Sequence, residues 1–318
     1  MKTHYLLVML VMIGVNFFLP RLMPGDPFLY LSVEDGNVSA VFSQEQIDHY
    51  KSYYGLDQPL HIQFWRYITG ILQGNLGSSI YYNTSVTEMI FTRMPWTLFI
   101  VLSSLILSSI IGTAIGAISA WLRDNPADRL MYLFMVIISE IPAFLVGVFF
   151  LFILAAQMQW FPLSGGSTVF ASFDSIWKQL GDILHHAFLP ILTLSLTRVG
   201  SFYLLSRNSM LTVLSKDYIR TARAKGIGQR NTIFRHALRN ALPPVIARVF
   251  MSMGALFGGA VLVENVFAYP GVGRLMLEAV TNRDYVLIQG IFLIITITVI
   301  LMNWLAEVIY RKLDPRVI

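Results

Sequence analysis

Six long apolar runs alternate with polar segments along the chain, and this alternation predicts helices that cross a membrane. Each run is close to the roughly 20 residues that a helix needs to cross the hydrocarbon core of a bilayer. The runs are residues 5–22, 96–121, 130–155, 184–205, 241–263 and 286–310. The pattern therefore predicts an all-α polytopic membrane protein with six transmembrane helices.

The longest segment between these runs, residues 23–94, has the pattern of a small folded cap that is rich in helix. Residues 43–46 and 85–88 each place a serine three positions before Gln or Glu, which is the capping box that opens a helix. Gly55 ends the first of these helices, and residues 63–73 repeat apolar side chains at helical spacing. We expect this cap to lie outside the membrane, between the first and second spans.

The first apolar run follows a lysine, as the apolar part of a signal peptide does. No small-x-small cleavage site comes after it, and the chain continues directly into a Pro-Gly-Asp-Pro turn at residues 24–27. We therefore expect residues 1–22 to remain as a transmembrane helix with the N-terminus in the cytoplasm.

Basic residues concentrate in the polar segment 207–240, which carries eight of them and a single acid, Asp217. Cytoplasmic loops of membrane proteins carry such an excess of Lys and Arg, so this segment is expected inside the cell. Alternation then places residues 123–129 and 311–318 inside, and residues 157–181 and 264–285 outside. The predicted domains are the first helix 1–22, the cap 23–94, a five-helix core 95–310 and a cytoplasmic tail 311–318.

Within the basic segment the pattern predicts two short helices separated by glycines. Residues 217–225 place Ile219, Ala222 and Ala224 on a short apolar face, with basic residues elsewhere. Gly226 and Gly228 then break the helix, because glycine is the most costly ordinary residue in a helix interior. A second helical pattern covers residues 232–242, and Pro243-Pro244 is expected to open the next apolar run.

Composition supports a membrane protein and excludes several kinds of chemistry. Of the 318 residues, 55% are hydrophobic and only 13% are charged, which a soluble domain of this size does not show. There is no cysteine, so disulfides, thiolate metal sites and cysteine nucleophiles are excluded. The net charge of +5 is explained by topology and needs no nucleic-acid partner.

Four ionisable residues fall inside the predicted spans, where a charge normally faces a partner or a water-filled cavity. Glu140 and Arg248 are candidates for lining a transport pathway, and packing between helices explains them equally well. For Arg198 and Glu307 we favour packing or contact with the membrane interface.

Sequence motifs for catalysis and nucleotide binding are absent from the chain. There is no G-x-x-x-x-G-K-[ST] phosphate loop, and the Gly226-Ile227-Gly228-Gln229 stretch lacks the Lys and the hydroxyl of such a loop. There is no H-E-x-x-H motif, and His185-His186 does not have the spacing of a supported metal site. We expect no catalytic residue, no metal site and no ATP hydrolysis by this chain alone.

Residues 217–226 (Asp-Tyr-Ile-Arg-Thr-Ala-Arg-Ala-Lys-Gly) and 235–243 closely resemble the EAA loop of bacterial ABC-importer permeases. In the general pattern a Glu precedes two small residues, a Gly comes four positions after them, and a Leu-Pro follows. Here Arg220 takes the Glu position, Thr221 and Ala222 are the small pair, and the Leu-Pro comes later. These departures resemble the branch that imports dipeptides, oligopeptides and nickel. Further segments resemble the same branch: residues 24–27, 53–60, 74–79, 269–274, 283–285 and 313–316.

The resemblance implies a type I importer permease whose basic loop couples to ATPases. The residues implied in this coupling are Asp217, Tyr218, Arg220, Thr221, Ala222, Arg223, Ala224, Lys225, Gly226 and Gly228. The implied partners are a second homologous permease, two cytoplasmic ATPase subunits, an extracytoplasmic substrate-binding protein and membrane lipid. ATP and Mg²⁺ would be bound by the ATPases, in the cytoplasmic membrane of a bacterium or archaeon.

Other functions stay open beside a peptide importer. The same kind of permease could carry nickel, a metal chelate or an oligosaccharide. An ion-coupled secondary transporter could use Glu140, but we find no internal repeat or paired intramembrane acids of the kind such carriers show. An intramembrane protease would need a Ser/His or paired-Asp arrangement at membrane depth, and no Asp lies inside a predicted span. A simple membrane anchor would not need six spans and a helix-glycine-helix loop.

Overall fold

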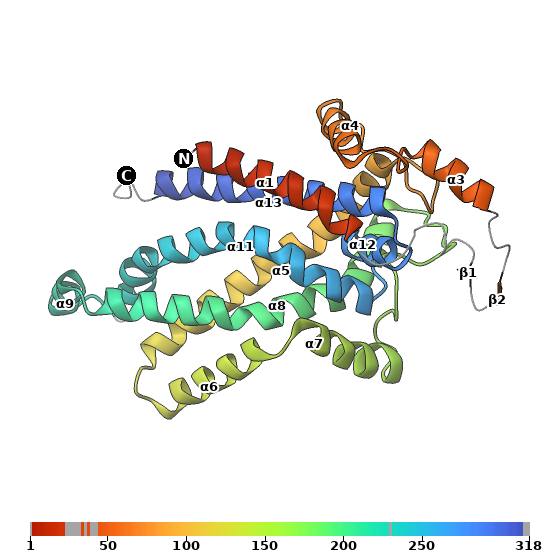
Figure 1. The fold of residues 1–318 in the computed structure, drawn as a ribbon. Coiled ribbons are helices and arrows are strands. Elements are labelled where there is room, and N and C mark those ends of the chain that lie inside the picture. The colour runs from red at the N-terminus through yellow and green to blue at the C-terminus, as the bar shows by residue number, and fades with distance from the viewer. Residues whose placement is uncertain (1, 23–32, 35–36, 39–43, 229–230, 314–318) are drawn as a thin grey trace. The chain divides into compact units, whose positions relative to one another are not determined.

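Helices make up most of the structure (Figure 1). The computed structural model describes residues 2–22, 33–34, 37–38, 44–228 and 231–313. The chain divides into two compact units, one formed by Met1–Pro95 with Gly271–Ile300 and the other by Trp96–Pro270 with Leu301–Ile318.

The first unit combines helices from both ends of the sequence. It contains α1 (Lys2–Arg21), β1 (Val33–Glu34), β2 (Asn37–Val38), α3 (Gln44–Tyr53), α4 (Leu60–Leu72), the start of α5 (Val86–Trp121), α12 (Val272–Thr281) and most of α13 (Tyr285–Leu313). The helix starts predicted from the two capping boxes are confirmed by α3 and α5, although Ser43 itself lies outside the described residues. The pairing of β1 with β2, which joins Val33 to Val38 in an antiparallel pair, was not predicted, because two-residue strands carry no alternating pattern.

Aromatic packing attaches α4 to the end of α1. Phe17 is fully buried, and its ring centroid lies 5.0 Å from that of Phe64 and 5.8 Å from that of Tyr67. The Arg21 guanidinium donates to Gln63 Oε1 at 2.9 and 3.1 Å. Burial raises the pKa of Tyr67 to about 12, so this phenol stays neutral at any physiological pH. Helix α4, which lies within the segment predicted to form a cap, is therefore packed on α1.

A buried carboxylate joins the segment before α5 to the start of α13. Asp284 accepts hydrogen bonds from the Ser79 hydroxyl at 2.5 Å and from the Tyr81 N–H at 3.1 Å. Its other oxygen accepts the Leu287 N–H at 3.0 Å, which makes Asp284 an N-terminal cap of α13. The Asp284 side chain thus joins two segments that are far apart in the sequence, since Ser79 and Tyr81 lie 205 and 203 positions before it.

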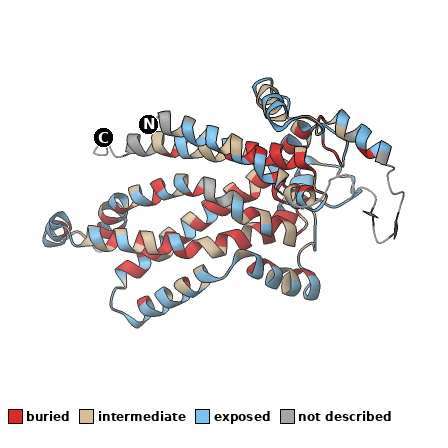
Figure 2. Cartoon of the chain, viewed as in Figure 1, coloured by how far each residue is buried: buried red, intermediate tan, exposed pale blue. Residues whose placement is uncertain are grey.

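The second unit is a bundle built around one long helix. It contains the rest of α5, α6 (Pro126–Glu140), α7 (Ala143–Phe150), the π-helix η1 (Leu151–Gln157), α8 (Ile176–Leu214), α9 (Asp217–Ala224), the π-helix η2 (Thr232–Leu238) and α11 (Arg239–Val266). α8 contacts α6, α7 and α11 along its length, and buried residues gather where these helices face each other (Figures 1 and 2).

Two glycines let α5 approach α8 closely. A Cβ on Gly112 would stand 2.6 Å from the Val199 carbonyl oxygen, and one on Gly116 would stand 2.5 Å from that of Tyr203. Small residues at such contacts are the usual means by which membrane helices come together. Ser206 completes the contact by donating from its hydroxyl to the Thr113 carbonyl at 3.0 Å.

The prediction of one continuous span over residues 130–155 is wrong. α6 ends at Glu140, the chain bends by 95°, and α7 continues into η1 (Figure 1). Ile141 is extended, with φ −77° and ψ 123°, as a residue before proline prefers, and Pro142 has no N–H to continue the helix. The run is therefore either a broken span or a re-entrant segment.

The helical pattern predicted over residues 232–242 is confirmed, although it forms no separate helix, because η2 leads into α11 without a break. Pro243 and Pro244, which were expected to open the next apolar run, both lie inside α11.

Three helices among the described residues are long and apolar enough to cross a membrane: Val86–Trp121, Ile176–Leu214 and Tyr285–Val308. The bent pair Pro126–Glu140 and Ala143–Gln157 would make a fourth if it forms one span. The structure is thus that of a multi-pass, mostly helical membrane protein, and the count of six spans stays a prediction.

Candidate functional site

The predicted helix over residues 217–225 is confirmed as α9, which stands on a small apolar cluster. Ile219 is fully buried, and Ala222 is buried one turn later. They pack on side chains from α5, α8, η2 and α11, namely Ala117, Ala120, Met210, Ile233, Ala237 and Ala241. The prediction that Ala224 shares this apolar face is wrong, because Ala224 is exposed.

The opposite face of α9 is polar and exposed. Asp217, Tyr218, Arg220 and Thr221 are exposed, as is Lys225 directly after the helix, while the side chain of Arg223 lies outside the described part of the structure. Asp217 and Arg220 approach to 3.7 Å, a surface ion pair of the kind that contributes little to stability. Helix α9 has eight residues, a buried apolar face formed by Ile219 and Ala222 (called its foot below) and a charged outer face. Such a helix is suited to contact another protein.

Gly226 ends α9 in a left-handed turn. Its φ is +73°, a conformation that glycine adopts at little cost. The Ile227 N–H reaches back to the Ala222 carbonyl at 3.2 Å, which is the characteristic bond of a Schellman motif. Gly228 has no such positive φ, so the predicted break depends on Gly226.

A largely buried ion pair that the sequence analysis missed joins α6 to α8. Arg207 of α8 donates to the two oxygens of Asp128 in α6, at 3.0 Å from Nε and 2.7 Å from Nη2. Ser119 of α5 hydrogen-bonds to Asp128, to Arg207 at 3.1 Å and to the Tyr203 hydroxyl at 2.7 Å. The Arg207 guanidinium also lies 5.6 Å from the centre of the Tyr132 ring. Three helices are thus joined by one polar cluster.

Nearly the whole chain matches two models of one transporter family. Residues 112–318 match the binding-protein-dependent transport system inner membrane component, and residues 2–101 match the N-terminal model of the same component. The chain belongs to this family of ABC-importer permeases. It is therefore a pore-forming, non-catalytic membrane subunit of an importer.

Curated relatives carry related names and match over nearly their full length. The chain is 32% identical over 312 residues to a probable peptide ABC transporter permease of Sinorhizobium fredii, covering 98% of this chain and 96% of the relative. It is 36% identical over 311 residues to a glutathione transport system permease of Salmonella paratyphi A, covering 97% of this chain and 94% of the relative. In fold it resembles an inward-facing structure of the MetNI methionine ABC transporter, with a TM-score of 0.59, 15% identity and 71% of this chain covered.

The two candidate pathway residues of this permease lie on different helices. Glu140 is exposed at the end of α6, directly before the bend at Ile141. Arg248 is exposed on α11, and among the described residues no ion pair joins it to Glu140. Arg198 of α8, for which packing was favoured, is half-buried, and its Nη2 lies 3.6 Å from the place where a Cβ on Gly259 of α11 would stand.

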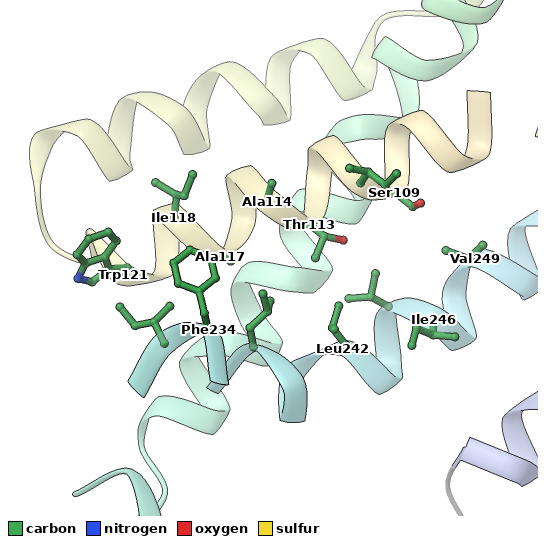
Figure 3. A pocket seen from close by; sticks show the side chains of 14 residues that line it. Ser109, Thr113, Ala114, Ala117, Ile118, Trp121, Phe234, Leu242, Ile246 and Val249 are labelled. Carbon is green, nitrogen blue, oxygen red and sulfur yellow. The ribbon is translucent and has the colours of Figure 1, made fainter. Parts of the chain in front are cut away.

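An apolar groove of about 390 Å³ lies between α5 and α11, next to the foot of α9 (Figure 3). Trp121, Phe234, Leu242 and Ile246 are among its lining residues, and Ser109 and Thr113 are the polar side chains in that lining. This lining offers no charged side chain to the charged termini of a peptide.

At the other end of the bundle a second buried carboxylate was missed by sequence reasoning. Glu264 is fully buried at the end of α11 and accepts a hydrogen bond from the Thr97 hydroxyl at 2.7 Å. Tyr269 packs edge-on against Trp96 at 5.7 Å, and burial together with the nearby Glu264 raises the pKa of its phenol. The contact fixes the turn after α11 to α5. No group of three metal-ligating side chains occurs among the residues that the structure describes.

Proposed function

We propose that this permease imports dipeptides and oligopeptides and couples to two cytoplasmic ATPases through α9. The observation that supports the coupling role is the division of α9 into a buried foot, Ile219 and Ala222, and an exposed charged face. The names of the relatives, which are peptide and glutathione permeases, support the substrate class.

In this proposal movement passes from α9 to the bundle through its apolar foot. Ile219 touches the cluster to which α5, α8 and α11 all contribute, so a displacement of α9 acts on three helices at once. When the ATPases close on ATP, two such permeases would rock between inward-open and outward-open arrangements as rigid bodies. The coupling residues are Asp217, Tyr218, Arg220, Thr221, Ala222, Arg223, Ala224, Lys225, Gly226 and Gly228.

The remaining parts of the assembly complete the proposal. The chain would have six spans in the cytoplasmic membrane of a bacterium or archaeon, with both termini in the cytoplasm. A second homologous permease would supply the other wall of the pathway, and the unit that contains α3 and α4 would receive the substrate-binding protein. ATP and Mg²⁺ would be held by the ATPases and not by this chain.

Charge reversal on the exposed face of α9 tests the coupling role. Arg220→Glu with Lys225→Glu is expected to lower peptide uptake and substrate-stimulated ATP hydrolysis roughly tenfold in the assembled complex, because the docking charges become repulsive. Lys178→Glu is the matched control, since Lys178 is an exposed base at the start of α8, far along the chain from α9.

Normal uptake and hydrolysis in the double variant would show that α9 does not dock. The same assay with Ni²⁺ or a trisaccharide in place of a tripeptide tests the substrate class. Uptake of one of these, and not of the peptide, would replace the peptide proposal without affecting the coupling role.

A further inference from the structure

A polar pocket of about 250 Å³ lies within the first unit, between α4, the end of α1 and the start of α13. Two arginines line it, Arg21 at the end of α1 and Arg66 on α4, and none of the described residues that line it is acidic. Across the part of the chain that the structure describes, no ion pair joins either arginine to a carboxylate. Two cations that share a pocket repel each other, and an anion bound near both relieves that repulsion.

Neutral groups hold the Arg21 guanidinium in a fixed orientation. Its Nε and Nη2 donate to Gln63 Oε1, its Nη1 donates to the Phe17 carbonyl at 2.8 Å, and its central carbon lies 3.7 Å from the centre of the Phe17 ring. The Gln63 amide is oriented in turn, because its Nε2 donates to the carbonyls of Leu56 and Gln58 at 3.2 and 2.7 Å. A guanidinium carries five N–H donors, so these bonds leave a second N–H on each Nη. The charge of Arg21 is therefore positioned but not neutralised.

A glycine leaves space for the second guanidinium. Nη1 of Arg66 lies 2.7 Å from the place where a Cβ on Gly55 would stand, and Gly55 has a φ of +66°. Gly55 lines the same pocket as Arg21 and Arg66. The close approach of the Arg66 side chain to this turn thus keeps its charge beside the pocket.

The Tyr67 hydroxyl is a third polar group of this pocket. Its oxygen is buried and has no hydrogen-bond partner among the residues that the structure describes. The phenol keeps its proton at physiological pH, because burial raises the pKa of Tyr67 to about 12. A buried hydroxyl without a partner is unfavourable, and the same hydroxyl can donate to the oxygen of an anion.

Exposed apolar side chains beside both arginines indicate a membrane surface. Leu22, directly after Arg21, is 81% exposed, and Trp65, directly before Arg66, is 67% exposed. Further leucines and valines are exposed along α1, as on a helix that contacts lipid. Tryptophan is enriched at the level of the lipid headgroups, and basic pockets at that level bind their phosphates.

We propose that Arg21, Arg66 and Tyr67 bind the phosphate of an anionic phospholipid headgroup at the extracytoplasmic end of α1. Guanidinium groups suit this role because their planar N–H donors match phosphate oxygens. Phosphatidylglycerol is preferred to phosphatidylcholine, because the two arginines repel the choline cation. The proposal rests on the proposed function, since it takes α1 to be a membrane span whose Arg21 end lies outside the cytoplasm.

The first test titrates the assembled complex in detergent with phosphatidylglycerol or phosphatidylcholine and counts bound lipid by native mass spectrometry. The wild-type complex is expected to prefer phosphatidylglycerol. Arg66→Gln should lower the affinity for phosphatidylglycerol about tenfold and leave phosphatidylcholine binding unchanged, because one charge-assisted contact is lost. Arg123→Gln is the matched control, since Arg123 is another exposed arginine close to an exposed tryptophan, Trp121, in the second unit.

The second test removes only the Tyr67 hydroxyl. Tyr67→Phe should lower the affinity for phosphatidylglycerol several-fold without lowering the melting temperature of the lipid-free complex, because the deleted hydroxyl has no described partner in the protein. A lower melting temperature with unchanged lipid affinity would overturn the role of Tyr67. Glycerol 3-phosphate, which has the phosphate but no acyl chains, should bind at least about a hundredfold more weakly than the lipid.

Equal affinity of the wild-type and Arg66→Gln complexes for phosphatidylglycerol would overturn the proposal. Equal affinity of glycerol 3-phosphate and the lipid would also overturn it, by showing that the ligand is a soluble phosphate ester. If Arg66→Gln kept the lipid and lost the substrate-binding protein, the pocket would receive an acidic side chain of that protein instead. Absence of peptide uptake by the wild-type complex would contradict the proposed function alone, because lipid binding is measured without transport.

Discussion

At the scale of single residues, α9 depends on one buried isoleucine and one glycine. The apolar pattern predicted that Ile219 and Ala222 would be buried, and they are, because they lie three positions apart on one helix face. Ala224 was placed on the same face, but it falls on the last residue of the helix, where the chain turns toward Gly226. A short helix leaves little room for a periodic pattern, so its last residue is hard to place.

Replacement of Gly226 tests the turn. A left-handed conformation costs an L-residue roughly 1–2 kcal/mol, so Gly226→Ala is expected to lower peptide uptake about fivefold or more. Gly226→Asn should have a smaller effect, since Asn tolerates this conformation better. Gly181→Ala is the control, because Gly181 of α8 lacks a positive φ and a Cβ there would meet no atom within 4 Å. A greater loss in Gly181→Ala than in Gly226→Ala would contradict this account of the turn.

At the scale of helices, hydropathy predicted where helices lie better than where they bend. Lengths and caps placed α1, α3, α5 and α9 correctly, since their starts or ends carry local signals such as capping boxes and glycines. The bend at Pro142 was overlooked, because an apolar window sums side chains and takes no account of a missing N–H. The Asp128–Arg207 pair was missed for another reason: its members are 79 positions apart, and nothing local marks them as partners.

This ion pair is expected to be essential for the bundle. Asp128 is buried, and breaking a buried pair by removing one partner costs roughly 3–5 kcal/mol, because the other charge is left without compensation. Asp128→Asn should therefore lower the melting temperature of the purified complex by several degrees, and Arg207→Lys should have a smaller effect through loss of the bidentate contact. The control is Asp124→Asn, whose carboxylate is exposed and lies 3.6 Å from Arg123. Equal melting temperatures for Asp128→Asn and Asp124→Asn would show that the cluster contributes little.

At the scale of the whole molecule, family membership and orientation rest on different observations. Membership follows from matches that cover residues 2–101 and 112–318, and it would hold whichever way the chain crosses the membrane. The expected orientation rests on charge, because segment 207–240 carries eight basic residues and a single acid, and such segments are typical of the cytoplasmic side. The docking of α9 to ATPases requires both, since ATP hydrolysis takes place in the cytoplasm.

Labelling of single cysteines in intact cells tests this orientation. Ser52→Cys on α3 and Ser167→Cys before α8 should react with a membrane-impermeant maleimide, whereas Ser215→Cys between α8 and α9 should react only after the cells are permeabilised. The native chain has no cysteine to interfere. Because Ser52 and Ser215 are both exposed, a difference between them reports the side of the membrane and not burial. Reaction of Ser215→Cys in intact cells would place α9 outside, where no ATPase can reach it, and the coupling proposal would then fail even though the family assignment stands.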